Sequence, residues 1–348
     1  CEDLWVNKDI EGRGIHKKNP IIDLKKKKVD ILINLSASPY TFKKLELRSK
    51  VSSFAAQYLQ VPLIYVNQIG ANDNLIFDGS SFILDKNGLK IKQLKSFSEE
   101  LSSWEIDQTK PEKNKFENSE MSSIFDALVL GVKDYAKKCG FKTALIGLSG
   151  GIDSALVSAI ATAALGSKNI YCVSMPSKWS SSHSKSDAED LASRLKINFN
   201  TFPIENLMKS FEESFKKSNN FEMAEITNQN IQSRIRGTLL MALANQDKHL
   251  LLSTGNKSEL AVGYCTLYGD MNGGLSVIGD LYKSNVFKLC NWLDSKDSIN
   301  HRKSYMLNMN VDIIGENIRK KAPSAELGPN QLDTDSLPPY SILDNILK

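Results

Sequence analysis

The sequence has few of the residues that build disulfide frameworks and metal clusters. Its 348 residues include five Cys and four His, and no two cysteines have the C-x-x-C spacing of a zinc or redox site. The number of cysteines is odd and they lie far apart, which disfavours a disulfide-stabilised secreted domain. We therefore expect a protein of a reducing compartment, the cytoplasm.

Long apolar runs and a large surplus of one charge are also missing. No run approaches the roughly 18 apolar residues that a membrane helix needs. The 44 basic and 40 acidic residues give a net charge of +4, which is too small to indicate nucleic acid. The one dense basic run, at 25–28, is typical of a solvated helix end; the alternative is a phosphate-binding patch. We expect neither nucleic acid nor a membrane as a partner.

What remains is the composition of an ordinary globular protein. The chain is 41% hydrophobic and 24% charged, which excludes collagen, coiled coils and wholesale disorder. Its length suffices for about two domains. The first residue is Cys instead of Met, and the first residues are typical of a domain interior. Beyond 327 the sequence becomes Pro-rich and stops before a natural domain end, so we expect a fragment.

The first hundred residues predict a small α/β unit. Apolar runs rich in β-branched residues at 29–35 and 63–66 flank a stretch with helical spacing at 45–59. Residues 78–84 and the Asn-Gly pair at 87–88 then predict a hairpin, because Asn-Gly supplies the positive φ of a tight turn. The sequence becomes polar and aperiodic from 104. We expect a domain over 1–103 and a linker over 104–121.

From 122 to 348 the pattern predicts a second domain in which strands and helices alternate. The expected strands are 143–148, 170–175, 199–204 and 250–253, and the expected helices include 123–138, 153–165, 186–196 and 227–245. Such alternation predicts an α/β fold with a doubly wound parallel sheet, covered by helices on both faces.

The segment SGGIDS, at 149–154, carries the clearest chemical signal. It follows a predicted strand and opens a predicted helix, so backbone N–H groups and the helix dipole can hold an anion there. Adjacent glycines let the backbone curl around a phosphate. The Walker lysine and the G-x-G-x-x-G spacing are both absent, which argues against a P-loop kinase and a Rossmann dehydrogenase. The alternative is a glycine-rich turn without a ligand.

This loop resembles that of the ATP pyrophosphatase superfamily, whose members split ATP into AMP and pyrophosphate to activate an oxygen as an adenylate. Further segments resemble the NAD synthetase family in their order along the chain. They are MPSKWSSSHSKSDAEDLA from 175, NIQSRIRG at 230–237, STGNKSE at 253–259, YGD at 268–270, DLYK at 280–283, PSAEL at 323–327 and LPPY at 337–340. The resemblance implies an adenine nucleotide alpha hydrolase-like fold for the second domain.

The first domain supplies a separate resemblance. CEDLW at 1–5, NLSASPY at 34–40 and DGSSF at 78–82 resemble the nitrilase-type glutaminase domain of glutamine-dependent NAD synthetases. The resemblance implies a partial nitrilase-like α/β sandwich in which Cys1 is the nucleophile and Ser38 and Lys44 hold glutamine. The Glu and Lys that assist the nucleophile in that family lie upstream of its Cys, so we expect no glutamine hydrolysis by these 348 residues.

The resemblance also implies the binding residues of the second domain. Magnesium is expected on Asp153 and Glu259, although Glu259 also has capping-box spacing to Asn256. A surface helix with solvated arginines is the alternative for the 230–237 segment. The residues implied for ATP are Gly147, Leu148, Ser149, Gly150, Gly151, Ile152, Asp153, Ser154, Thr254 and Lys283, and those implied for deamido-NAD are Asn230, Arg234, Glu259 and Asp270.

The implied reaction is the ATP-dependent amidation of deamido-NAD to NAD by a C–N ligase, with ammonia taken from glutamine or supplied free. The resemblance further implies a homo-oligomer. Two alternatives remain: another ATP pyrophosphatase such as GMP synthetase, and a nucleotide-binding module without turnover. A product assay with deamido-NAD against XMP separates the first, and pyrophosphate release separates the second.

Overall fold

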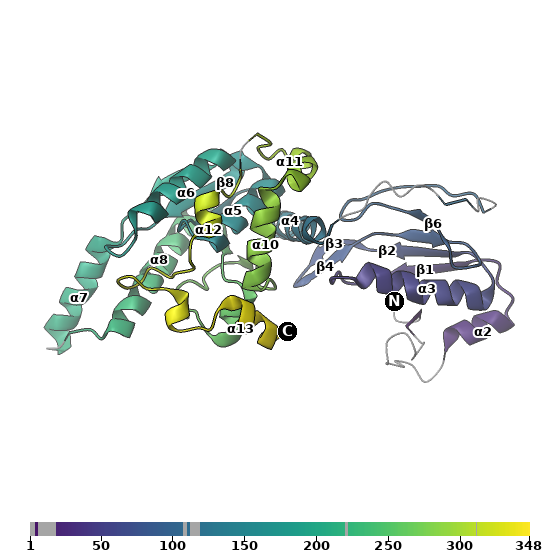
Figure 1. The fold of residues 1–348 in the computed structure, drawn as a ribbon, viewed down its shortest axis with the longest axis horizontal. Helices are drawn as coiled ribbons and strands as arrows, with labels where there is room; N and C mark the ends of the chain where they lie inside the picture. The colour runs from purple at the N-terminus through teal and green to yellow at the C-terminus, as the bar shows by residue number, and fades with distance from the viewer. Residues whose placement is uncertain (1–3, 6–18, 107–109, 112–118, 220–221, 311) are drawn as a thin grey trace. The chain divides into compact units, whose positions relative to one another are not determined.

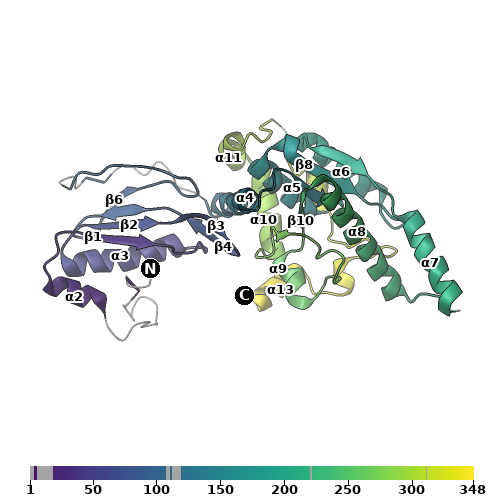
Figure 2. The ribbon, with the colours of Figure 1, turned by 180° about the vertical axis from the view of Figure 1, so that it is seen from behind.

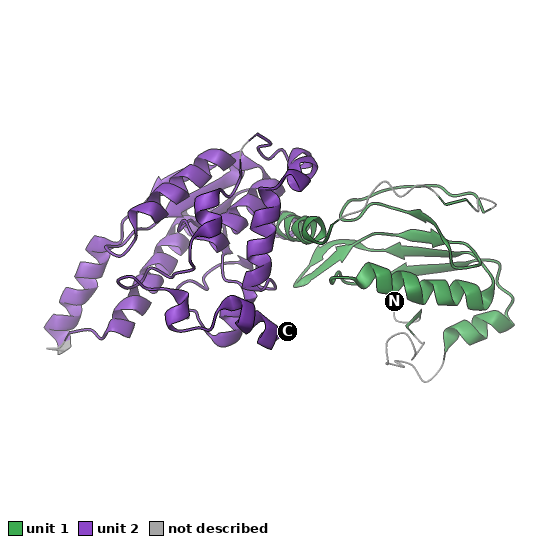
Figure 3. Cartoon of the chain, viewed as in Figure 1, with its two compact units in different colours: residues 1–134 green, residues 135–348 purple. Residues whose placement is uncertain are grey.

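The computed structural model describes residues 4–5, 19–106, 110–111, 119–219, 222–310 and 312–348 (Figure 1). The chain forms two compact units, residues 1–134 and 135–348, each with its own parallel or mixed sheet (Figure 3). The expected domain limits, 1–103 and 122–348 around a linker, stay a prediction, since most of the segment 107–118 lies outside the described residues. Among the residues described, no helix is both long and apolar enough to span a membrane.

The sheet of unit 1 combines parallel and antiparallel strands in the order β1-β2-β5-β6. The first two strands are parallel and the others antiparallel, and α3 (Lys44–Leu59) lies between β1 and β2 in the chain, as its helical spacing predicts. Val51, Ala55 and Ala56 of α3 are buried in the core of this unit, to which α2 (Pro20–Lys26) adds Ile21. The strands are β1 (Leu32–Ser36), β2 (Leu63–Asn67), β5 (Phe82–Leu84) and β6 (Lys90–Gln93).

The predicted hairpin of unit 1 is β5–β6, and its turn is where the Asn-Gly pair places it. Gly88 has a φ of +78°, the left-handed conformation that glycine adopts without strain. The strand before the turn begins at Phe82, later than predicted. Asp78 instead ends β4 (Leu75–Asp78), which pairs with β3 (Ile69–Asn72) in a second hairpin that the sequence analysis did not predict.

Unit 2 contains the predicted parallel sheet, with five strands in the order β11-β10-β7-β8-β9. The four predicted strands are confirmed: the last has the predicted bounds, two are shorter by one or two residues, and the strand predicted at 199–204 lies at 198–201. The fifth, β11 (Leu275–Ser276), is too short to produce a sequence pattern. The others are β7 (Ala144–Gly147), β8 (Ile170–Ser174), β9 (Asn198–Thr201) and β10 (Leu250–Ser253).

Helices cover both faces of the unit 2 sheet (Figures 1 and 2). Leu145, Val173 and Leu251 pack in one cluster with side chains of α8 (Glu225–Asp247). Because side chains alternate along a strand, Ile146 and Cys172 point to the other face. There Ser158 of α5 (Ile152–Leu165) lies with its Oγ 3.7 Å from the Cys172 Sγ. The doubly wound fold expected from the sequence is therefore confirmed.

The remaining helices complete the two units. The boundary between the units falls within α4 (Glu120–Lys138), the first helix of the alternating pattern. The other helices are α6 (Ser182–Leu195), α7 (Glu205–Asn219), α9 (Lys257–Val262), α10 (Lys283–Leu293), α11 (Ile299–Ser304), α12 (Glu316–Lys320) and α13 (Tyr340–Leu347).

Candidate functional site

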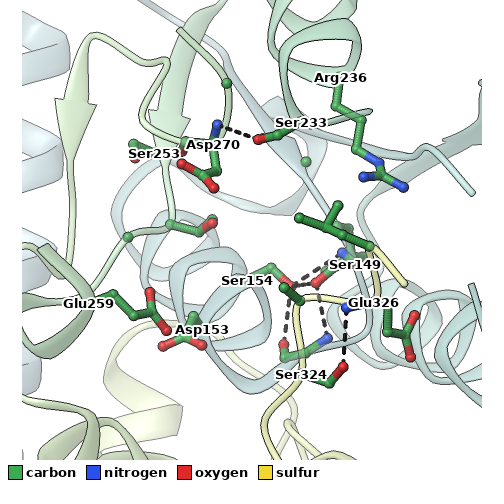
Figure 4. Close-up of a pocket in the computed structure, with 18 of the residues that line it drawn as sticks. Ser149, Asp153, Ser154, Ser233, Arg236, Ser253, Glu259, Asp270, Ser324 and Glu326 are labelled. Carbon is green, nitrogen blue, oxygen red and sulfur yellow. Dashed lines mark hydrogen bonds between the residues drawn. The ribbon is translucent and has the colours of Figure 1, made fainter. Parts of the chain in front are cut away.

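A cavity of about 460 Å³ opens at the carboxyl ends of strands in unit 2 (Figure 4). Its walls come from the segments that follow β7, β8 and β10, from one face of α8, and from the C-terminal segment at 318–333. In open α/β sheets this edge is where ligands bind, because loops from neighbouring strands meet there. The site can therefore be built from these loops.

The turn between β7 and α5 is the SGGIDS segment. The Ser154 Oγ lies 3.1 Å from the Ser149 Oγ, accepts from the Ser149 N–H at 3.3 Å and donates to the Gly151 carbonyl at 3.0 Å (Figure 4). Gly151 is the N-cap of α5, and no side chain caps the helix there. The serines thus fix a turn that presents a helix N-terminus to the cavity, a geometry suited to phosphate.

The structure explains why position 150 in this turn is a glycine. Its φ is +78°, and a Cβ at this position would lie 2.2 Å from the Ser184 carbonyl oxygen on α6. Only glycine can hold this turn against α6. Of the eight expected ATP residues at 147–154, seven line the cavity and Gly150 does not.

Two carboxylates and one lysine gather at the base of the cavity. The Lys283 Nζ lies 2.5 Å from the Asp153 Oδ2 and 2.9 Å from the Glu259 Oε1. The three side chains come from three helices, α5, α9 and α10. The lysine is only 3% exposed, whereas the carboxylates are 18% and 19% exposed and line the cavity (Figure 4). The structure therefore brings together three side chains that lie up to 130 residues apart in the chain.

Asn256 is the N-cap of α9. Its Oδ1 accepts from the Glu259 N–H at 3.1 Å, and its Nδ2 donates to the Asp153 Oδ1 at 3.0 Å. The capping expected from the spacing of Asn256 and Glu259 is thus provided by Asn256. The Glu259 carboxylate is directed toward Lys283 instead.

Burial and like charge perturb these groups. Burial, together with the neighbouring Asp153 carboxylate, raises the pKa of Glu259 to about 7, against the opposing effect of Lys283. Burial disfavours the charged form of Lys283, yet Asp153 and Glu259 outweigh it and raise the pKa of this lysine. A further cation beside Asp153 and Glu259 would favour the ionised form of Glu259, which burial and Asp153 disfavour.

The donor set fits Mg²⁺ bound partly by its ligand. Mg²⁺ typically takes one or two protein carboxylates and completes its shell with phosphate and water oxygens. Within the described parts of the chain, no three or more His, Cys, Asp or Glu side chains are grouped so that they could hold a metal alone. Asp153 and Glu259 lie beside the phosphate-type turn, so phosphate oxygens could supply the remaining ligands.

Asp270 faces the same cavity from the loop before β11. Its Oδ1 accepts from the Thr266 N–H at 2.9 Å, and its own N–H donates to the Ser233 Oγ of α8 at 3.0 Å. Burial raises the pKa of Asp270, against these hydrogen bonds. Thr254, expected at the ATP site, also lines the cavity.

Asn230 and Arg234 do not line the cavity. The Arg234 Nε donates to the Leu267 carbonyl at 3.2 Å, and the Asn230 Oδ1 accepts from the Thr266 Oγ1 at 3.0 Å. Both residues therefore hold the loop that carries Asp270. Their expected contact with deamido-NAD stays a prediction.

Arg236 is a cavity residue that the sequence analysis missed. It is anchored by an Nε hydrogen bond of 3.0 Å to the Met175 carbonyl, and burial lowers its pKa to about 10, against the attraction of Glu326. Ser233, Gly237 and Leu240 line the cavity from the same helix. Ser233 and Gly237 are small residues four positions apart, so they lie on one face of the helix. This spacing within the NIQSRIRG motif could have identified the face that lines the cavity.

The C-terminal segment supplies two more residues that were not assigned a role. Ser324 and Glu326, within the PSAEL motif, both line the cavity. The Glu326 Oε1 accepts from the Ser181 Oγ at 3.1 Å and from the Ser184 Oγ at 2.5 Å. These contacts join the segment to the N-terminus of α6, where a wall of the cavity forms.

In unit 1 the structure places two of the three expected glutaminase residues. Ser38 is buried, and the Asn67 side chain bonds both its N–H, at 2.9 Å, and its carbonyl, at 3.2 Å. The Lys44 Nζ lies 4.4 Å from the centre of the Trp5 ring, a cation–π contact. Cys1, the third, lies outside the described residues, so its place beside Ser38 and Lys44 stays a prediction.

Comparison with known proteins agrees with both units. The family model described as NAD synthase matches residues 124–348, and the one described as carbon-nitrogen hydrolase matches residues 14–112. The glutamine-dependent NAD(+) synthetase of Synechocystis sp. is 47% identical over 352 aligned positions, which cover all of this chain and 61% of that protein. The chain thus spans about 61% of the length of this curated relative.

Solved structures give the same result. The glutamine-dependent NAD+ synthetase of Acinetobacter baumannii, solved with ADP, aligns with a TM-score of 0.81 and 36% identity over all of this chain and 60% of that one. NMN synthetase from Francisella tularensis aligns with a TM-score of 0.56 and 28% identity, covering 66% of this chain and 87% of that one. Because the NAD synthase family model matches residues 124–348, well over half of the chain, the chain belongs to the NAD synthase family.

Proposed function

We propose that unit 2 catalyses the ATP-dependent amidation of deamido-NAD to NAD, with release of AMP and pyrophosphate. The observation that supports this most directly is the grouping of the SGGIDS turn, Asp153, Glu259 and Lys283 in one cavity. Transfer of AMP requires that the triphosphate of ATP be held in place and its negative charge be neutralised, and these groups could do both. The family membership of residues 124–348 agrees with this assignment.

Activation of the carboxylate is the first step. A carboxylate resists ammonia because its carbonyl carbon is electron-rich and the oxide is a poor leaving group. In the proposed step a nicotinate oxygen attacks the α-phosphorus of ATP, the bond to pyrophosphate breaks, and an acyl adenylate forms. Ser149, Gly151 and Ser154 would hold the departing pyrophosphate, and the Lys283 ammonium would stabilise the developing negative charge.

The donor set of Asp153 and Glu259 would hold Mg²⁺, which when bound neutralises phosphate charge. Arg236, whose guanidinium borders the cavity, would bind an anionic group of one substrate. Asp270, with Asn230 and Arg234 behind its loop, would lie on the deamido-NAD side. In the second step ammonia attacks the acyl carbon, AMP leaves with the C–O electron pair, and nitrogen loses a proton.

The glutamine half of the reaction is proposed for unit 1. The match of residues 14–112 to the carbon-nitrogen hydrolase family supports it. Assisted by the Glu and Lys that the family places upstream of its Cys, Cys1 would attack the amide carbon of glutamine, ammonia would leave as a thioester forms, and water would then release glutamate. Ser38 and Lys44 would hold the substrate. Without that Glu and Lys we expect no glutamine hydrolysis by these 348 residues. The fixed backbone of Ser38 is consistent with a binding role.

Product analysis tests the proposal. We expect ATP, Mg²⁺, ammonium and deamido-NAD to give AMP, pyrophosphate and NAD in equal amounts. XMP and nicotinate mononucleotide serve as matched alternative substrates. Neither should be amidated, and neither should cause release of AMP and pyrophosphate. Amidation of XMP alone would contradict the assignment, and nucleotide binding without any pyrophosphate release would favour a binding module.

A further inference from the structure

Helix α10, which begins with Lys283, has no N-terminal cap of its own. The preceding residue, Tyr282, occupies the N-cap position and makes no side-chain capping bond. The first N–H groups of a helix have no partner within the helix and need acceptors from elsewhere. Two residues from other helices supply them.

Ser258 and Asp344 are these residues. The Ser258 Oγ accepts from the Lys283 N–H at 2.9 Å, and the Asp344 Oδ2 accepts from the Ser284 N–H at 2.8 Å. The same Ser258 hydroxyl donates to the Asp344 Oδ1 at 2.5 Å. Both residues are buried: Ser258 is 0% exposed and Asp344 is 1% exposed. A carboxylate at a helix N-terminus also interacts favourably with the helix dipole.

The network couples the two helices that carry the charged cluster. Ser258 directly precedes Glu259 on α9, and Ser284 directly follows Lys283 on α10. Asp344 contacts both from α13, which lies beside α9 and α10 (Figure 2). The same helix places the Tyr340 ring 5.2 Å from the Lys283 Nζ. Asp344 itself does not line the cavity.

We propose that Asp344, acting through Ser258, is a positioning residue that sets the place of Lys283 between Asp153 and Glu259. This inference rests on the proposed function, in which the Lys283 ammonium stabilises charge on the transferred phosphate. Without the Asp344 carboxylate, the Ser284 N–H in the first turn of α10 loses its acceptor. The Ser258 hydroxyl also loses the acceptor of its hydrogen bond. Lys283 then leaves the geometry that the transfer requires.

A matched control lies at the other end of the same helix. The Asp294 carboxylate, 1% exposed, accepts from the N–H groups of Ile313, Ile314 and Gly315 at 2.7–2.9 Å. Like Asp344 it is buried and holds backbone N–H groups. It belongs neither to the cavity lining nor to the N-terminus of α10. Its replacement should affect stability without moving Lys283.

The experiment compares Asp344→Ala, Asp344→Asn and Asp294→Ala in the full chain with ATP, Mg²⁺, deamido-NAD and ammonium. We expect both alanine variants to lower the unfolding temperature. Asp344→Ala should also lower kcat by about tenfold or more, since small displacements of a reacting group have large effects, while KM for deamido-NAD stays within about twofold. Asp344→Asn keeps one acceptor oxygen and should recover part of kcat. Asp294→Ala should keep kcat within about twofold.

Amide hydrogen exchange gives a readout that does not need turnover. Exchange at Lys283 and Ser284 should quicken in Asp344→Ala and stay unchanged in Asp294→Ala. A kcat for Asp344→Ala equal to that of Asp294→Ala, or unchanged exchange at 283–284, would overturn the proposal. If the unaltered chain releases no AMP, the proposed function fails and the exchange comparison still decides the positioning role. If Asp344→Ala does not fold, Asp344→Asn decides it.

Discussion

Each unit contains a cluster of opposite charges, and the two clusters are built differently. In unit 1 the Arg48 guanidinium bonds both oxygens of Asp78, at 2.6 and 2.7 Å, and the side chains are 0% and 3% exposed. In unit 2 the Lys283 ammonium serves two carboxylates, each nearly one-fifth exposed toward a cavity. The first cluster is balanced in charge and closed, whereas the second sets two carboxyl groups against one lysine and is open to the cavity.

This difference separates a structural ion pair from a chemical site. In the Arg48–Asp78 pair a single guanidinium nitrogen, Nη2, bonds both carboxylate oxygens, so one positive charge balances one negative charge away from solvent. With two carboxyl groups and one lysine, the unit 2 cluster can take another cation and, bound to that cation, phosphate. If burial were the only criterion for a functional site, the unit 1 pair would be the stronger candidate. Charge balance and access to a cavity instead favour the unit 2 cluster as the functional site.

The largest expected effect comes from Asp153→Asn. The amide keeps the shape and the bond to Asn256 but removes one carboxylate, so the capacity for a cation falls. We expect adenylate formation to drop by about 10²–10³-fold with the fold intact. Isotope exchange between pyrophosphate and ATP in the presence of deamido-NAD measures it. Exchange that falls less than about threefold would contradict the role of the carboxylate pair.

Arg48→Met tests the closed cluster of unit 1. The change leaves the Asp78 charge buried without its cation, which should lower the free energy of unfolding of unit 1 by about 3–5 kcal/mol. The double variant Arg48→Met with Asp78→Leu removes both charges and should recover most of the loss. Urea unfolding measures both. If the single and double variants were equally unstable, packing and not the unpaired charge would be the cause.

Arg236 and Arg234 provide a comparison within one helix. Arg236 lines the cavity, while Arg234 is exposed and bonded to the loop at Leu267. We expect Arg236→Ala to lower kcat/KM by about 10–100-fold, as for loss of a charge-assisted bond to an anion. Arg234→Ala should have a smaller effect. The reverse order in steady-state kinetics would favour Arg234 as the direct contact.

The smallest expected effect concerns His249, at the amino end of β10. Its Nδ1 lies 2.7 Å from the Thr143 Oγ1, its ring stacks on Tyr171, and burial lowers its pKa against the attraction of Asp247. The folded state therefore favours neutral His249, so the stability it contributes is present above its ordinary pKa of 6.5 and is lost as the pH falls below it.

We expect the unfolding temperature of the unaltered chain to decrease more than that of His249→Gln between pH 7.5 and pH 5. The difference should be a few degrees, since about 1 kcal/mol shifts a domain of this size by roughly 2–4 °C. Calorimetry across this range measures it. Parallel pH profiles for the two proteins would show that His249 does not titrate differently in the folded state.

Much of the architecture was predictable because local patterns and tertiary structure agree in it. The β7 strand, the SGGIDS turn and α5 follow one another in the chain, so their geometry is set within about 20 residues. The two-residue strand β11 and the β3–β4 hairpin have no such local pattern. Their pairing depends on neighbouring strands that the sequence does not reveal.

The site was predictable only in part for a related reason. Thr254, Glu259 and Lys283 were assigned through resemblance, and the cavity includes them. Arg236 was missed because two arginines two residues apart lie on different sides of a helix, and only packing shows which one faces inward. The trans-capping of α10 by Asp344 joins residues about 60 apart, which no local motif encodes.

The central claim is that the turn at Ser149–Ser154 holds the phosphates of ATP beside Asp153 and Glu259. A crystal structure of the chain with Mg²⁺ and a non-hydrolysable ATP analogue tests it most directly. We expect phosphate oxygens at the backbone N–H groups of this turn and within reach of Lys283. An analogue bound at another place, with the turn empty, would contradict it.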